Sequence, residues 1–268
     1  MFNKNHPTKR SSVWLAMLLI GLAAVSAGAQ EQAPEGTSDA ALDADAILER
    51  VNAAWQGESF HGIIALEITL GGATKLHRLE VWTLGEALAL VRVLEPEIDR
   101  DSGYLQLGDE LWYYAPAIGS IKLPSLAIGD ALFGAGPSLA DISHGTLSDD
   151  YDVSVVGLPE GSDVPERYFM TLIPHLDAPV VYGKLELWVT TDDVMEQIIY
   201  YDQRGEVLQT AEFTDIIELG DRKVATTIVI EDSFGDRTIE RIEDPQFDLE
   251  LDATFFSIET FESWGEVE

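Results

Sequence analysis

The sequence contains no cysteine and few basic residues, and both deficits restrict what the chain can do. Without cysteine, disulfides, zinc–thiolate sites, iron–sulfur clusters and cysteine nucleophiles are all excluded. Lys and Arg number 16 against 48 Asp and Glu, which gives a net charge of −32. A chain this acidic repels nucleic acid and anionic membrane surfaces, so we expect no nucleic-acid partner, good solubility and a monomer.

Long hydrophobic runs are also scarce, and the one that exists lies near the N-terminus. Val13 to Val25 is apolar, follows Lys4, Lys9 and Arg10, and gives way to Ala27-Gly28-Ala29. The run is shorter than the ~20 residues that a helix needs to cross a bilayer. A basic start, a short apolar middle and an A-x-A end predict a secretory signal peptide over residues 1–29. We therefore expect a secreted, periplasmic protein whose mature net charge, without those three basic residues, is −35.

The mature chain begins with one predicted helix. Residues 30–37 are rich in Glu, Pro and Gly and predict a flexible leader, and residues 38–268 form the predicted domain. Helical spacing runs from Ser38 to Trp55, with Asp43 as the expected N-cap and Gly57 as the expected stop. Its apolar face should carry Ile47, Leu48, Val51 and Trp55.

From Phe60 onward the apolar residues alternate with polar ones, which is typical of strands. Turn signals divide this region into eleven to thirteen strands with short, mainly antiparallel connections. Strands do not alternate with helices, so a parallel α/β fold is not expected. We predict a mainly β, single-domain fold built on one strongly curved antiparallel sheet, with helices covering its concave face.

One connection is too long and too apolar for a simple turn. Pro116 to His144 contains three prolines and a predicted short helix around Leu126–Phe133. Long connections in compact domains are usually functional. We predict that this segment is a helical lid loop.

Patterns that carry catalysis or metal binding are missing. Ser125, Ser138, Asp141 and His144 lie close in sequence, but there is no G-x-S-x-G nucleophile elbow. The five histidines never stand four residues apart, and the acidic clusters do not match a calcium loop. No G-x-G-x-x-G loop occurs either. We therefore predict no enzyme activity, no metal and no cofactor.

Some strands are apolar on both faces, notably Leu111–Tyr114 and Val224–Ile230. A sheet with few helices must hide such a second face. A cavity that is left vacant for a lipid would do so.

The stretch from Val91 to Ile142 contains a strand ending in EP, an R-x-x-G-x-L step, then LWYYAP and a G…S-x-x-D-I segment. The fixed positions of the second and fourth of these motifs are Arg100, Gly103, Leu105, Gly136, Ser138, Asp141 and Ile142. In this order and at these spacings, the motifs resemble the outer-membrane lipoprotein-sorting family of LolA-like periplasmic carriers. Further on, YGKLELWV, YYDQRGEVLQTAEFTDI and LDATFFSIETFE resemble the later strands and the end of the family.

This resemblance implies an open half-barrel with a helical lid that accepts acyl chains of a lipoprotein or lipid and carries them toward the outer membrane. It also implies an inner-membrane transporter as partner. After LWYYAP, relatives carry several basic residues, whereas this chain keeps only Lys122 among residues 119–122. The residues that we select for the apolar cavity and its lid are Leu66, Val91, Leu105, Trp112, Tyr114, Leu126, Phe133, Phe169, Leu187 and Trp188.

Two other functions stay open at this point. The same fold can serve as a sensor or as an accessory subunit of an envelope export system, without carrying cargo. A secreted hydrolase is the third alternative, although the sequence offers it no nucleophile motif.

Overall fold

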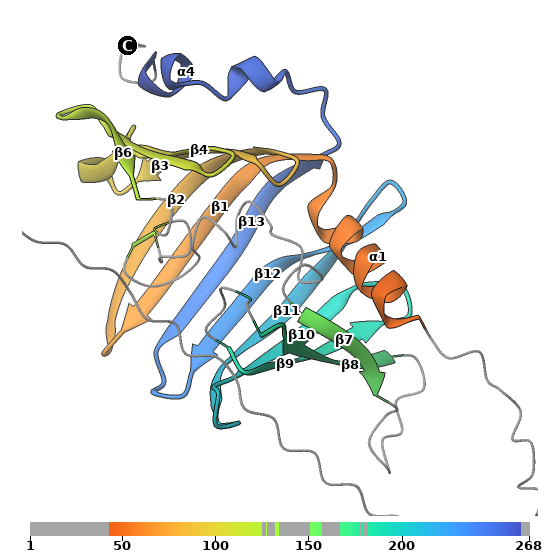
Figure 1. Cartoon of the computed structure of the whole chain (residues 1–268). Helices are drawn as coiled ribbons and strands as arrows, with labels where there is room; N and C mark the ends of the chain where they lie inside the picture. The colour runs from red at the N-terminus through yellow and green to blue at the C-terminus, as the bar shows by residue number, and fades with distance from the viewer. Residues whose placement is uncertain are drawn as a thin grey trace, which may run out of the picture. The chain divides into compact units, whose positions relative to one another are not determined.

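The computed structural model describes residues 43–124, 127, 132–133, 151–156, 167–176, 178 and 182–263. The predicted signal peptide and leader lie outside these residues. Helices are few in the described part and strands dominate it (Figure 1). The helices are α1 (Ala44–Gln56), η1 (Glu97–Asp99), η3 (Ala253–Phe255) and α4 (Ile258–Ser263). The strands are β1 (Ser59–Leu70), β2 (Ala73–Leu84), β3 (Leu88–Glu95), β4 (Gly103–Leu107), β5 (Glu110–Ala115), β6 (Gly119–Leu123), β7 (Tyr151–Val156), β8 (Arg167–Pro174), β9 (Lys184–Thr190), β10 (Met195–Tyr201), β11 (Val207–Leu219), β12 (Arg222–Asp232) and β13 (Arg237–Phe247).

All thirteen strands belong to one sheet, in the order β6-β5-β4-β3-β2-β1-β13-β12-β11-β10-β9-β8-β7. Each neighbouring pair is antiparallel. The order follows the chain except where β1 pairs with β13, which joins the first strand to the last. β6 and β7 form the two edges, so the sheet is open. The prediction of a mainly β fold with an open antiparallel sheet is confirmed.

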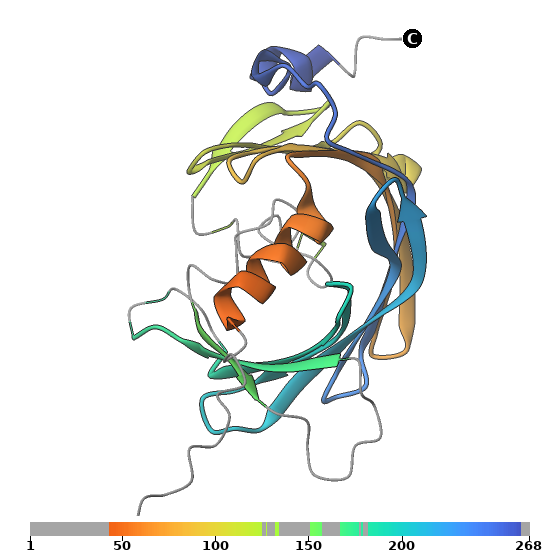
Figure 2. The same cartoon turned by 90° about the vertical axis from the view of Figure 1, so that its right-hand side faces the viewer.

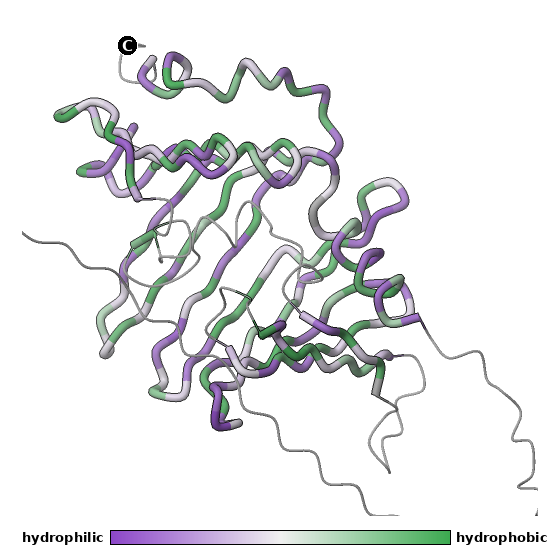
Figure 3. Tube along the Cα trace, viewed as in Figure 1, coloured by the Kyte–Doolittle hydropathy of each residue, from purple (hydrophilic) through white to green (hydrophobic). Residues whose placement is uncertain are grey.

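The register gives the sheet two distinct faces. Residues directly opposite each other on antiparallel strands share a face, and successive residues alternate between faces. The run Ile228–Glu240–Leu66–His77 crosses four strands in register on one side. We call this side the inner face, because α1 packs on it, and the other side the outer face. Hydropathy alternates along the strands accordingly (Figure 3).

Helix α1 lies within the curve of the sheet (Figure 2). The predicted caps Asp43 and Gly57 are confirmed, while residues 38–42, where the helical spacing was expected to begin, lie outside the described residues. The Asp43 side chain accepts a hydrogen bond from the Ala46 amide at 3.2 Å, and Gly57 ends the helix at φ 64°. A Cβ at Gly57 would also approach Asp248 Oδ1 to 2.8 Å. Glycine is therefore favoured here both by the positive φ and by the lack of space for a side chain. The predicted apolar residues Ile47, Leu48 and Val51 are buried.

The C-terminal segment covers part of the outer face. After β13 the chain forms η3 and α4, which bring Phe256 and Phe261 onto Leu90 and Leu105. Figure 2 shows this segment on the side of the sheet away from α1. The sequence showed that the tail contains apolar residues, and the structure shows that the tail packs over part of the outer face.

The long connection between the edge strands begins later than predicted. Residues 119–123 form β6 and pair with β5, so the first part of the expected lid loop belongs to the sheet. Of its remainder, only Pro124, Ala127, Leu132 and Phe133 are described. The predicted short helix therefore lies almost entirely outside the described residues.

Candidate functional site

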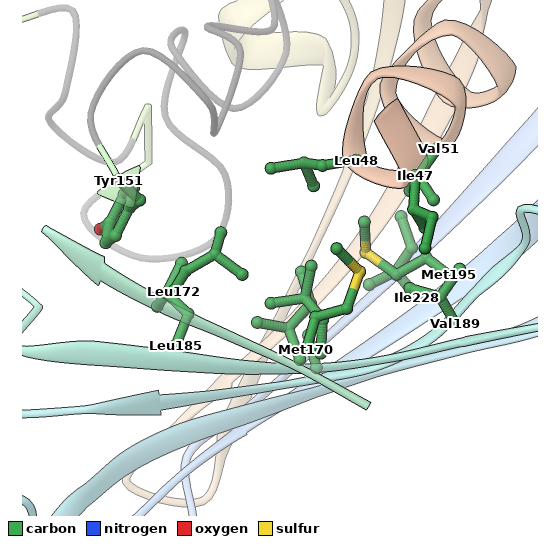
Figure 4. Close-up of a cluster of buried hydrophobic side chains, with 13 residues drawn as sticks. Ile47, Leu48, Val51, Tyr151, Met170, Leu172, Leu185, Val189, Met195 and Ile228 are labelled. Atoms are coloured by element: carbon green, nitrogen blue, oxygen red, sulfur yellow. The ribbon is translucent and has the colours of Figure 1, made fainter. Parts of the chain in front are cut away.

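The inner face beneath α1 carries a cluster of buried apolar side chains (Figure 4). The strands provide residues such as Met170, Leu187 and Ile228, and the helix closes over them with Leu48 and Val51. We call this group the helix-side cluster. Two of its members, Met170 and Met195, are methionines, whose flexible side chains adapt to packing of different shapes.

A second apolar cluster occupies the inner face of β1 to β5, and we call it the distal cluster. Leu66, Leu79 and Val91 are among its buried members. Leu132 and Phe133, from the predicted lid segment, pack against it. Because the two clusters lie on the same side of one sheet, they make the inner face apolar along most of its width.

Polar side chains interrupt the inner face between and beside the clusters. Thr238, Glu240 and His77 are buried there, each less than 10 % exposed. Both ring nitrogens of His77 lack a hydrogen-bond partner. Burial lowers the pKa of His77, and the approach of Lys75 lowers it further, whereas Asp99 opposes the shift. The imidazole is therefore neutral around neutral pH.

Tyr104 is another polar group beside the distal cluster. Its hydroxyl donates to the Leu132 carbonyl at 3.2 Å, which ties the described part of the lid segment to β4. Burial raises the pKa of the Tyr104 hydroxyl, and the nearby Tyr113 and Asp99 raise it too. The hydroxyl thus stays protonated and able to donate.

Arginine contacts hold α1 over the sheet near its middle and at its carboxyl end. Arg50 Nε donates to Asp193 Oδ2 at 2.9 Å, in the turn between β9 and β10. At the carboxyl end of the helix, Arg222 donates to the carbonyls of Ala53 and Ala54 and to Asp248. The Ala53 carbonyl also accepts from the Gly57 amide, and Arg222 gives the Ala54 carbonyl a donor at the end of the helix, where carbonyls lack partners within the helix.

A small crevice opens between α1 and the sheet. Val51, Trp55, Met195 and Ala225 are among the residues that line it. Its cavity volume is about 10 Å³, which is room for roughly one water molecule. Drug-sized ligands occupy pockets of about 300–1,000 Å³. With α1 seated as described, this crevice holds no acyl chain.

The ten residues selected from the sequence do not share one surface. Leu66, Val91 and Leu187 are on the inner face, and Phe133 packs against it. Leu126 lies outside the described residues. The other five are on the outer face: Leu105, Trp112, Tyr114, Phe169 and Trp188. The first three of these pack in the cluster beneath the C-terminal segment, and Phe169 contacts Trp188 with ring centroids 4.8 Å apart.

The outer face of β9 and β10 is polar beside that aromatic pair. Tyr201 donates its hydroxyl to Glu186 Oε2 at 2.5 Å, and Lys184 lies 3.8 Å from the Tyr201 ring centroid. Burial and the bond to Glu186 raise the pKa of Tyr201 to about 12. The outer face of β9 and β10 therefore carries polar contacts rather than a continuous apolar surface.

Sequence reasoning missed several residues of the inner face. Met170 and Met195 were not selected, and neither was His77. Alternation alone could have placed His77 with Leu79 and Val81 on an apolar side of β2. A histidine in such a pattern is the signal that was available.

Neither a metal site nor a membrane span is found in the described part of the chain. No group of three or more His, Asp or Glu side chains is placed there to hold a metal ion. No helix there is long and apolar enough to cross a membrane.

Comparison with known proteins identifies relatives of this fold. A family model described as "Uncharacterized protein" matches residues 85–263. No curated protein matches the sequence.

Solved structures give a consistent result for the fold. A LolA superfamily protein from Nitrosomonas europaea is 24% identical, with a TM-score of 0.66, over 80% of this chain and 97% of its own. A domain from Vibrio parahaemolyticus, assigned to outer membrane lipoprotein sorting, is 16% identical with a TM-score of 0.70, over 82% and 98%. A DUF1329 family protein from Desulfovibrio piger is 17% identical with a TM-score of 0.70, over 81% and 96%. The chain therefore has the LolA-like fold that its sequence motifs implied.

Proposed function

Since this chain belongs to the family whose model matches residues 85–263 and has the LolA-like fold, we propose that it is a periplasmic carrier of acyl chains. It would bind the chains of a lipoprotein or lipid on the inner face of its sheet and shuttle them toward the outer membrane. An inner-membrane transporter would act as the donor, and the carrier would work as a monomer.

The observation that carries this proposal is the apolar inner face. The helix-side cluster and the distal cluster extend over both halves of an open sheet. Among the described elements, α1 is the only helix on that face, and it has 13 residues. A packed core of this width would ordinarily be closed by a second layer of strands or helices. An acyl chain is chemically suited to the same surface.

The energetics favour a cavity that opens only when cargo arrives. Burial of each CH₂ group contributes about 0.8 kcal/mol, so a sixteen-carbon chain gains about 12 kcal/mol on leaving water. That gain can offset displacement of side chains that cover the inner face. Met170 and Met195 would allow such repacking at low cost.

The direct test is chemical analysis of the purified mature protein. Organic extraction followed by mass spectrometry should recover acyl lipid in near-stoichiometric amount. Protein that carries no lipid and takes up no fluorescent fatty acid would contradict the proposal.

Two neighbouring residues of β9 provide matched variants for the binding site. Leu187 is buried on the inner face and Trp188 lies on the outer face. Leu187→Gln should weaken uptake of the fluorescent fatty acid, while Trp188→Gln should leave uptake unchanged. Far-UV circular dichroism checks that both variants are folded. Equal uptake by the two variants would show that the inner face is not the binding surface.

A second candidate function is that of a sensor or accessory subunit of an export system. The crevice beside α1, at about 10 Å³, leaves no room for an acyl chain under the seated helix at that point, which suits a protein that binds a partner without carrying cargo. In that case the extraction experiment recovers no lipid, although the protein still binds its partner.

The periplasmic location rests on the N-terminal segment. Lys4, Lys9, Arg10 and the apolar run before Ala29 are the features that support export. Release of the protein by osmotic shock, with its N-terminus at Gln30, is the expected result.

A further inference from the structure

His77 on β2 is a buried polar residue whose ring nitrogens have no hydrogen-bond partner in the described part of the chain. The residue is only 6 % exposed. Buried polar groups in folded proteins are nearly always paired, and an unpaired one costs free energy. A phenylalanine or leucine would fill the same place without that cost. The histidine therefore calls for an explanation outside folding.

The surroundings of His77 place it inside the proposed binding surface. It stands opposite Leu66 on the inner face, beside the distal cluster. The Phe133 ring stacks on the imidazole with centroids 4.0 Å apart and planes 19° apart. Stacking covers the face of the imidazole, whereas its hydrogen bonds run in the ring plane through the nitrogens. The bonding edge is therefore free of the Phe133 contact.

The charges near His77 select the kind of group that it can bind. Neutral imidazole has one N–H donor and one acceptor nitrogen. Glu240 is buried on the same face, two strands away across Leu66, and Asp99 is close enough to influence the ring. Lys75 is the nearby cation. A carboxylate or phosphate would have to be buried on the same face as Glu240 in a chain of net charge −32, and a lone neutral donor would not offset that.

We propose that His77 is the polar contact for the head of an acyl chain, and that it donates a hydrogen bond to an uncharged ester carbonyl. This inference rests on the proposed function, because it assumes that acyl chains enter the inner face. The inference also specifies the class of ligand. Ester-linked acyl groups, as in a glyceride or a lipid-modified protein, should bind more tightly than free fatty acids.

Three fluorescent probes separate this inference from the proposed function. Diphenylhexatriene is a hydrocarbon and reports entry into the apolar surface alone. The methyl ester of cis-parinaric acid adds a carbonyl, and cis-parinaric acid itself adds a carboxylate at neutral pH. The full mature chain should bind the methyl ester more tightly than the acid.

The decisive variant is His77→Phe, which keeps an aromatic ring but removes the donor. The affinity for the methyl ester should fall about tenfold, the effect of losing roughly one hydrogen bond, while the affinity for diphenylhexatriene stays the same. His61→Phe is the matched control, since His61 lies on the outer face against Trp82, and it should change neither affinity.

The outcomes distinguish the two proposals. If no probe binds to the wild-type chain, the proposed carrier function fails and the inference fails with it. If diphenylhexatriene binds but His77→Phe leaves ester binding unchanged, or lowers both affinities equally, only the role of His77 is overturned. Tighter binding of the acid than of the ester would overturn the ligand class.

Discussion

At the scale of single residues, Arg222 has the clearest structural role. Its guanidinium bonds two carbonyls at the end of α1 and Asp248 after β13, and it lies 4.7 Å from the Phe247 ring centroid. Its side chain is only 15% exposed, so water screens these bonds weakly. One side chain thus joins α1, β12 and the start of the C-terminal segment.

Replacement of Arg222 by methionine should therefore destabilise the protein. Charged hydrogen bonds of this kind contribute about 1.5–3 kcal/mol, so we expect a loss of about 2 kcal/mol in the free energy of unfolding. Urea titration followed by circular dichroism measures it. Arg204→Met is the control, because Arg204 is 77% exposed in its ion pairs and should cost less than about 0.5 kcal/mol. Equal effects would mean that the helix anchor is not formed in solution.

His77 should make stability depend on pH in a defined direction. Its pKa in the folded chain is below the ordinary value of 6.5, so below about pH 6.5 the unfolded chain binds a proton more readily than the folded chain. The contribution of His77 to stability therefore falls as the pH drops through this range. His77→Phe should be more stable than wild type at about pH 8, by about 1 kcal/mol, and by more at about pH 5.

Thermal unfolding of the two proteins across this pH range is the measurement. The difference between them isolates His77 from the many acidic groups that both share. A stability difference that does not change with pH would contradict the burial of the imidazole.

Gly103 belongs to the R-x-x-G-x-L motif, and the structure gives a steric reason for the glycine at this position. A Cβ at Gly103 would lie 2.0 Å from the Val91 carbonyl oxygen, so no other residue fits between β3 and β4 here. The R-x-x-G-x-L step that supported the family resemblance therefore marks close strand packing. Its Leu105, selected as a cavity residue, faces the other side of the sheet.

At the scale of elements, the C-terminal segment is the part that the sequence described least well. The sequence showed its apolar residues but did not predict which surface they pack against. Phe261 is fully buried, with its ring centroid 5.5 Å from that of Tyr114. By covering Leu90 and Leu105, η3 and α4 turn the outer face of β2 to β5 into a second core.

Removal of the Phe261 ring should test this second core. Phe261→Ala is expected to cost about 3–5 kcal/mol, because it leaves a cavity among buried side chains. Phe234→Ala removes the same ring from a turn where the residue is 90% exposed, and should change stability by less than about 0.5 kcal/mol. Denaturant midpoints compare the two. Similar small effects would indicate that the segment does not pack on the sheet.

At the scale of the whole molecule, charge is the dominant feature. The chain has 48 acidic against 16 basic residues, and its ion pairs are mostly at the surface. Self-repulsion among the excess acids favours expanded states of the chain. Salt screens this repulsion, because the Debye length shortens from above 10 Å at low salt to about 3 Å at 1 M.

Salt should therefore raise the melting temperature. A gain of about 1 kcal/mol corresponds to a rise of about 2–4 °C for a chain of this size, and we expect at least that between about 0.05 M and 1 M NaCl. Calorimetry in NaCl and in choline chloride should give the same shift if screening is the cause. A melting temperature that falls with salt would show that the attractive ion pairs outweigh the repulsion.

The sequence by itself determined the local structure of this protein. Asp43 and Gly57 bounded α1, alternation located most strands, and motif order indicated the fold, because capping, alternation and turns depend on a few neighbouring residues. β6 escaped notice because Gly119 to Leu123 is short and lies next to a proline-rich segment.

Only the tertiary structure decided which side of each strand turns inward. β5 has large apolar or aromatic side chains on both faces, so its sequence contains no mark of direction. Register with distant strands settles it, and a shift of one residue would exchange the faces. For this reason Trp112 was selected for the cavity but lies on the outer face. Trp188 was selected for its aromatic ring, although Lys184 and Glu186 mark its side of β9 as the polar one. His77 went unnoticed on the inner face.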